Sequence, residues 1–226
     1  MLIAPLPPLA AALFSVLAIA SLLLSFVMLG SRWLKQYLYA FAAESWMIAG
    51  ISAAVGFFDH VPELYLIAGL TVAFRGLMLP WLIWRMIDRL TIDREFHEIV
   101  QPASGLVIGA LFVVFALAVS YRIAGALSVK PGVAVLALTV MLAMMLIGFL
   151  LLAVRREAIS QILGLLVLEN GIFLGSQILV PGMPLLFELV VLFDLLVLIA
   201  CFGVLVAYLQ THAGTTNARD LKRLVG

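Results

Sequence analysis

The amino-acid sequence predicts an all-α integral membrane protein with about seven transmembrane helices. Of the 226 residues, 65% are hydrophobic and only 11% are charged, whereas charged residues make up about 25% of an ordinary soluble domain. The apolar residues form continuous runs of about 20 residues, the length that a helix needs to cross a bilayer. Because these runs occupy most of the chain, we expect no soluble domain and no catalytic site on this chain alone.

Three apolar runs, at 8–29, 37–58 and 63–86, predict the helices of an N-terminal part over residues 1–100. The first run lacks the basic segment that precedes the core of a secretory signal, so we expect a retained span. SRWLKQ and DHVPE separate the runs, and the charged segment RMIDRLTIDREFHEIVQP follows the third. Charged residues, Pro and Gly end helices, and the breaks therefore support three spans.

Four further runs predict a C-terminal part over residues 101–226, and they lie at 104–123, 132–154, 157–180 and 183–209. They are separated by YRIAGALSVKPG, RRE and VPGMP, and a short tail follows the last. The Pro and Gly of VPGMP predict a tight reversal, so the last two helices should be antiparallel neighbours.

The distribution of Lys and Arg predicts the orientation. Arg122 and Lys130 fall on one side of the predicted bundle, and Arg75 lies inside a span. The basic residues on the other side are Arg32, Lys35, Arg85, Arg89, Arg94, Arg155, Arg156, Arg219, Lys222 and Arg223. Cytoplasmic loops carry such an excess, so we expect a multi-pass protein of the inner (plasma) membrane with its N-terminus outside and its C-terminus in the cytoplasm.

Five ionisable residues lie inside the apolar runs, and these are Glu44, Arg75, Glu169, Glu188 and Asp194. A charge at the centre of a membrane helix costs about 2.5–3.5 kcal/mol on insertion scales, so such residues usually face a bundle interior and mark ion or proton pathways. We therefore expect the functional site among these residues.

Glu169 lies about twelve residues into its run, roughly 18 Å deep, and Asp194 is also near the midplane. Both are predicted to take part in a proton relay, and Asn170 is a polar neighbour of Glu169. Glu188 lies nearer the outer end, where its side chain can extend to the interface. A purely structural role, with the carboxyl hydrogen-bonded to another helix, stays open for each.

Glu44 and Arg75 lie at similar depths in the second and third runs. Antiparallel neighbouring helices can bring them together as an ion pair, which either fixes helix packing or holds a proton in a charge-coupled relay. Pro80 follows Arg75 and is expected to kink or loosen the third helix near this charge.

The sequence indicates no cofactor or metal on this chain. Cys201 is the single cysteine, and iron–sulfur clusters need several thiolates. The histidines all lie between or beyond the apolar runs, where a haem inside the membrane finds no ligands: His60, His97 and His212. A methionine group is expected to pack rather than to bind metal, and it consists of Met141, Met144 and Met145. No Walker A loop, GxSxG, HExxH or paired CxxC occurs, and nothing points to nucleic acid.

Three segments resemble the hydrogenase-4 component E family, membrane subunits of group 4 nickel–iron hydrogenase and formate hydrogenlyase complexes. They are QILGLLVLENG, FDLLVLIACFGVLVA and the tail QTHAGTTNARDLKRLVG. In the first half, FRGLMLP looks like a family segment with a basic residue followed by Pro. The resemblance implies a membrane-arm subunit that helps to move protons or sodium ions.

The last three predicted helices, over about 132–209, also look like the K subunit of respiratory complex I. Leu166 stands where we expect the first carboxylate of that subunit, and Glu169 follows about one turn later. Asp194 or Glu188 would stand for the second carboxylate, and the depth of Asp194 favours it. The implied partners are antiporter-like and H-subunit-like membrane proteins and a peripheral redox module, which carries any nickel, iron–sulfur cluster or quinone.

Two other functions stay open. A self-contained secondary transporter or channel should show inverted repeats and interrupted helices at a midplane site, and neither is expected from this sequence. A scaffold subunit would use its buried charges only to specify helix packing, and would tolerate neutral substitutions.

Overall fold

The computed structural model describes a helical bundle over residues 7–58, 62–90, 101–126, 132–155 and 158–179, together with Leu189, Leu196, Ala200 and Gly203. The helices in chain order are α1 (Pro8–Gly30), α2 (Leu34–Phe58), α3 (Glu63–Leu70), the π-helix η1 (Thr71–Met78), α4 (Leu79–Leu90), α5 (Pro102–Ala126), α6 (Val133–Val154) and α7 (Ala158–Leu179). Within the described residues, five segments are long and apolar enough to cross a membrane, and these are Pro8–Gly30, Leu34–Phe58, Glu63–Arg85, Pro102–Ala126 and Val133–Val154. The protein is therefore a helical membrane protein.

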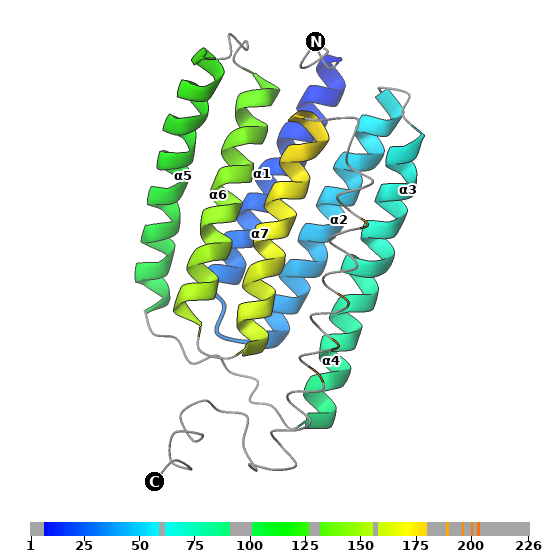
Figure 1. Ribbon diagram of the computed structural model, residues 1–226, viewed down its shortest axis with the longest axis vertical. Coiled ribbons are helices and arrows are strands. Elements are labelled where there is room, and N and C mark those ends of the chain that lie inside the picture. The colour runs from blue at the N-terminus through cyan, green and yellow to red at the C-terminus, as the bar shows by residue number, and fades with distance from the viewer. Residues whose placement is uncertain are drawn as a thin grey trace.

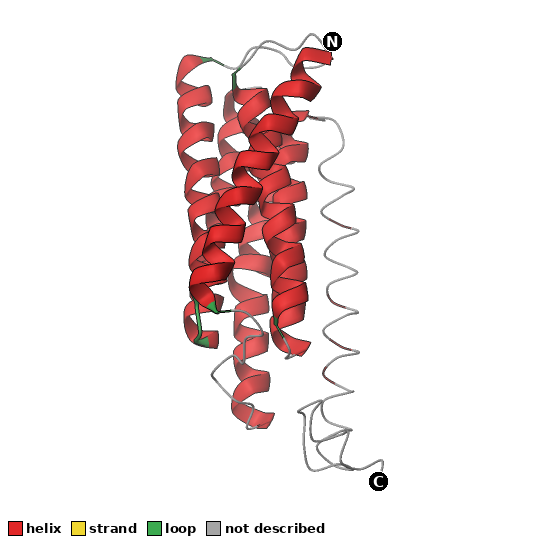
Figure 2. Ribbon diagram, turned by 90° about the vertical axis from the view of Figure 1, so that its left-hand side faces the viewer, coloured by secondary structure: helices red, strands yellow, loops and turns green. Residues whose placement is uncertain are grey.

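The helices run up and down along one common axis (Figure 1). α1, the α3–η1–α4 rod and α6 run in one direction, while α2, α5 and α7 run in the other. Figure 2 shows the same bundle from the side, with the described helices aligned along its long axis. The observed bounds lie within a few residues of the first six predicted runs. The seventh, 183–209, lies outside the described residues except for Leu189, Leu196, Ala200 and Gly203, each of which is helical.

The third predicted span is one rod in which a π-helical segment separates two α-helices. Through η1 the hydrogen bonds reach one residue further back than in an α-helix, and the Leu79 N–H donates to the Phe74 carbonyl. Pro80 has no N–H, and its ring pushes away the carbonyl four residues earlier. The expected loosening before Pro80 is thus confirmed, and it takes the form of π-helical backbone around Arg75.

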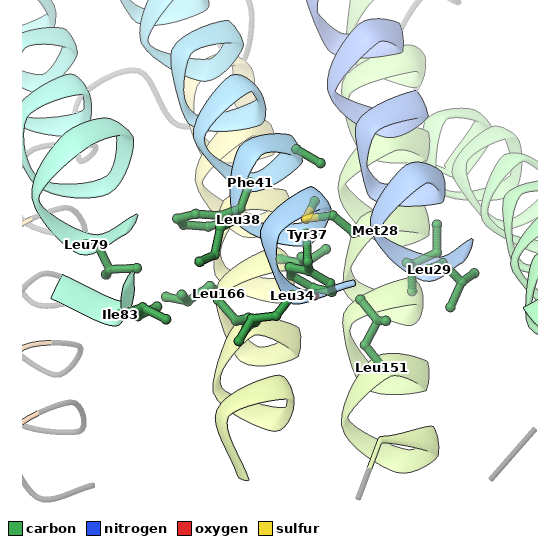
Figure 3. Packing of buried hydrophobic residues seen from close by; sticks show 14 residues of the cluster. Met28, Leu29, Leu34, Tyr37, Leu38, Phe41, Leu79, Ile83, Leu151 and Leu166 are labelled. Atoms are coloured by element: carbon green, nitrogen blue, oxygen red, sulfur yellow. The ribbon is translucent and has the colours of Figure 1, made fainter. Parts of the chain in front are cut away.

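The interior contains two apolar clusters. The first, shown in Figure 3, fills the space where α1 ends and α2 begins, against the end of α6 and the first half of α7. The second includes Phe14, Ile48, Ile51, Phe173 and Leu174. Large apolar side chains elsewhere point outward, as on α5, where Val114 is 65% exposed. An apolar exterior is what a surface in contact with lipid requires.

The closest helix pair is α6 against α7, where glycines replace larger side chains at the contact. A Cβ at Gly148 would lie 2.7 Å from the Leu168 backbone nitrogen, and one at Gly171 would lie 2.7 Å from Met144 Cβ. Small residues let membrane helices approach closely. Met144 is fully buried in this interface, in agreement with the packing role expected for it.

Candidate functional site: a buried polar network

Glu44 is the centre of a polar network that joins four elements of the bundle. Its side chain is 0% exposed. Ser25 Oγ of α1 donates to Glu44 Oε1 at 2.6 Å, and Asn170 Nδ2 of α7 donates to Glu44 Oε2 at 2.8 Å. Each carboxylate oxygen of Glu44 therefore accepts a hydrogen bond from a different helix.

Arg75 enters the network from η1. Arg75 Nη1 donates to Asn170 Oδ1 at 2.7 Å, and its guanidinium carbon lies 5.4 Å from the centre of the Phe173 ring. The arginine is fully buried. Phe173 stabilises the guanidinium by a cation–π contact, which is strongest where water is excluded.

Gly76 has no side chain, and this leaves space for a tryptophan of α2 next to Arg75. A Cβ at Gly76 would lie 2.8 Å from Trp46 Nε1, so the indole of α2 rests directly on the backbone of η1. Trp46 thus helps to fix η1 against α2, next to the residue that carries the buried charge.

Asn170 connects Glu44 and Arg75 by hydrogen bonds, while the direct ion pair expected from the sequence stays a prediction. An asparagine amide has a donor at one end and an acceptor at the other. Asn170 therefore accepts from the guanidinium and donates to the carboxylate. The network is a line of three groups from three elements, with Ser25 at its end.

The other predicted site residues have different positions. Glu169 is only partly buried, whereas the adjacent Asn170 is fully buried and faces α2. Successive residues of a helix differ by about 100° in direction, so the two side chains face different neighbours. Glu188 and Asp194 lie outside the described residues.

Sequence reasoning did not single out Ser25, Ser52 or Gln177. Gln177 Nε2 donates to Ser52 Oγ at 2.8 Å, and both side chains are fully buried. The signal that could have found Ser25 is its spacing of four residues from Ser21, which places two hydroxyls on one face of an otherwise apolar helix.

Arg155, counted among the cytoplasmic loop cations, is only 2% exposed. Its Nη2 donates to the carbonyls of Met28 and Ser31 at 3.3 and 2.8 Å. The last carbonyls of a helix have no partner within that helix, and a basic side chain there also complements the helix dipole. Arg155 therefore stabilises the end of α1.

The arrangement can hold a proton, and it can pass one on if Glu44 exchanges its hydrogen-bond partners. Within the described part of the chain, no three side chains of His, Cys, Asp or Glu are grouped so that they could hold a metal ion.

Comparison with known proteins identifies one informative relative. The chain is 30% identical over 203 residues to the uncharacterized protein Rv0085 of Mycobacterium tuberculosis, and the match covers 89% of this chain and 91% of the relative. No protein-family model and no solved structure matches the chain. The chain belongs to the same family as this mycobacterial protein.

Proposed function

We propose that this chain is a non-catalytic membrane-arm subunit of a complex I-like redox-driven ion pump of the group 4 hydrogenase type. In this proposal it provides part of a proton translocation path. The observation that carries the proposal is the hydrogen-bonded line of Arg75, Asn170 and Glu44 inside an apolar bundle. A membrane protein that needed only packing could use apolar residues there, because a buried ion pair is often no more stabilising than apolar side chains of similar volume.

The network suits proton transfer for a chemical reason. Glu44 can take up a proton on Oε1 if the Ser25 hydroxyl turns to accept from it, because a hydroxyl can either donate or accept. The Ser25 hydroxyl can then donate to the Ser21 carbonyl, which is 3.2 Å away. Arg75 lies beyond Asn170 in the same line, so its charge attracts the carboxylate across the bridging amide. Glu44 is therefore the proposed proton carrier, and Glu169, Asp194 and Glu188 extend the path.

The apolar runs and the distribution of Lys and Arg supply four finer parts of the proposal: seven spans, an outer N-terminus, a cytoplasmic C-terminus and a location in the inner (plasma) membrane. The resemblance to hydrogenase-4 component E supplies the partners. The proposed partners are antiporter-like and H-subunit-like membrane proteins and a peripheral redox module. This chain itself would hold no cofactor.

One observation favours a self-contained secondary transporter as the second candidate. Transporters carry interrupted helices at their binding sites, and η1 departs from α-helical geometry at the residue with the buried charge. The hydrogen-bonded rod nevertheless continues through η1 into α4, so the interruption is partial.

Isolation of the tagged chain from its native membrane in a mild detergent tests the proposal. We expect it to carry antiporter-like subunits and a subunit with iron–sulfur clusters, detected by mass spectrometry and by iron content. Recovery as a homo-oligomer would contradict the proposal and support the transporter. Arg122→Gln at the predicted outer end of α5 is a control, because it lies on an exposed position away from the network.

A further inference from the structure

Ser52 and Gln177 form a second polar contact between α2 and α7, displaced along the bundle from the Glu44 network. Ser52 follows Glu44 by eight residues and Gln177 follows Asn170 by seven. At about 1.5 Å per residue, the second contact lies about 10 to 12 Å further along the axis. α2 and α7 run in the same direction (Figure 1), so the two contacts are successive steps toward the end at which both helices stop.

Gln177 has a buried side-chain oxygen, an acceptor that no described residue satisfies. Its Nε2 donates to Ser52, but its Oε1 is buried and has no hydrogen-bond partner among the described residues. The side chain is 0% exposed. A buried acceptor without a partner costs about 1–3 kcal/mol, and a bound water is the usual means of satisfying it.

An apolar layer separates the two contacts. Ile48 and Leu174 each follow the network residue of their own helix by four positions, which places them on the same helix faces as Glu44 and Asn170. Both are 0% exposed, and both belong to one packed apolar cluster. We call Ile48 and Leu174 the apolar layer.

We propose that Ser52 and Gln177 bind a water that receives the proton from Glu44, and that the apolar layer controls this transfer by excluding or admitting water. This inference rests on the proposed function. The transfer breaks the O–H bond of protonated Glu44 and forms one on a water in the layer, with no electron movement. The water in the layer then passes a proton to a second water, which Gln177 Oε1 and Ser52 Oγ hold. The proton leaves this second water toward the ends of α2 and α7. Hydrophobic constrictions in channels gate by the same exclusion of water.

Passive proton flux through the purified full chain in liposomes tests the inference, with a pH-sensitive dye inside and a potassium diffusion potential as the driving force. Leu174→Ser places a hydroxyl in the layer and lowers the free energy needed to hydrate it. We expect proton entry to be roughly tenfold faster than in the wild type, which corresponds to about 1.36 kcal/mol of lowered barrier. Adding Glu44→Gln or Gln177→Leu should return the flux to the wild-type level.

Leu151→Ser is the matched control, because Leu151 is equally buried but lies on α6 in the other apolar cluster. We expect it to leave proton entry unchanged. The inference would be overturned if the folded Leu174→Ser protein admitted protons no faster than the wild type. It would also be overturned if the faster proton entry persisted after Glu44→Gln was added to Leu174→Ser. If Leu174→Ser does not fold, Ile48→Thr makes the same test. None of these fluxes depends on partners, so failure here is distinct from failure of the proposed assembly.

Discussion

Glu44 and Arg75 show how a membrane interior tolerates charge. Neither is left to a single partner: Glu44 accepts from Ser25 and Asn170, and Arg75 donates to Asn170 and lies over Phe173. Removing one member of a buried charged group is strongly destabilising, because the remaining charge loses its compensation. Asn170 is the residue on which both charges depend.

Asn170→Ala should therefore destabilise the protein more than an ordinary polar truncation in a membrane helix. We expect a loss of about 1–3 kcal/mol in the free energy of unfolding, since two buried groups lose hydrogen bonds at once. Thermal unfolding in detergent measures it. Ser176→Ala is the control on the same helix, because Ser176 donates only to a carbonyl of its own helix. Equal midpoints for the two variants would contradict the bridging role of Asn170.

The residues of the site were partly predictable. Charge in an apolar run identified Glu44 and Arg75, because that signal does not depend on how a helix is turned. The choice between Glu169 and Asn170 does depend on how α7 is rotated about its axis. Because α7 is apolar around most of its circumference, the pattern of apolar residues does not show which of the two faces α2. Ser25 and Ser52 were missed because a serine can satisfy its hydroxyl within its own helix, as Ser45 does here.

At the scale of the elements, the approximate ends of the described helical segments were predictable, because Pro, Gly and charged residues separate the apolar runs. The π-helical form of η1 was not predictable. Pro80 indicated where the helix would be disturbed, but the sequence does not show which backbone hydrogen bonds replace the missing one. The close contact of α6 and α7 also became clear only in three dimensions. Glycines occur in many parts of this chain. Only the atoms around each glycine in the structure show which glycines allow two helices to approach closely.

Gly148→Ala should separate α6 from α7, because its Cβ would lie within 2.7 Å of backbone that cannot move alone. We expect a loss of about 1–3 kcal/mol in stability, the usual cost of overpacking. Gly125→Ala on α5 is the control, since a Cβ there meets nothing within 4 Å. Thermal unfolding of the two variants in the same detergent decides the point, and a Gly148→Ala protein as stable as the control would show that the contact is not tight.

At the scale of the whole molecule, the proposed orientation rests on the unequal distribution of Lys and Arg. It predicts which end of the bundle a membrane-impermeant thiol reagent can reach. In a Cys201→Ser background, Pro7→Cys at the start of α1 should react in intact cells. Arg32→Cys, at an exposed position beyond the other end of α1, should react only after the membrane is permeabilised. The reverse labelling pattern would invert the proposed topology.

The hydrogen-bonded line of Arg75, Asn170 and Glu44 crosses the apolar interior of the described bundle, and the central claim is that this line carries protons. Glu44→Gln tests it most directly, because glutamine has nearly the same size but cannot carry the proton. Its amide oxygen can accept from Asn170 and its NH2 can donate to the Ser25 hydroxyl. Ser45→Ala is the control, since Ser45 is equally buried on α2 and donates only within its own helix.

The measurement is redox-driven acidification of inverted membrane vesicles that contain the assembled complex, recorded together with the rate of the redox reaction. We predict that Glu44→Gln leaves the complex assembled and lowers the number of protons moved per turnover, while Ser45→Ala matches the wild type. Unchanged acidification per turnover in the Glu44→Gln complex would contradict the account.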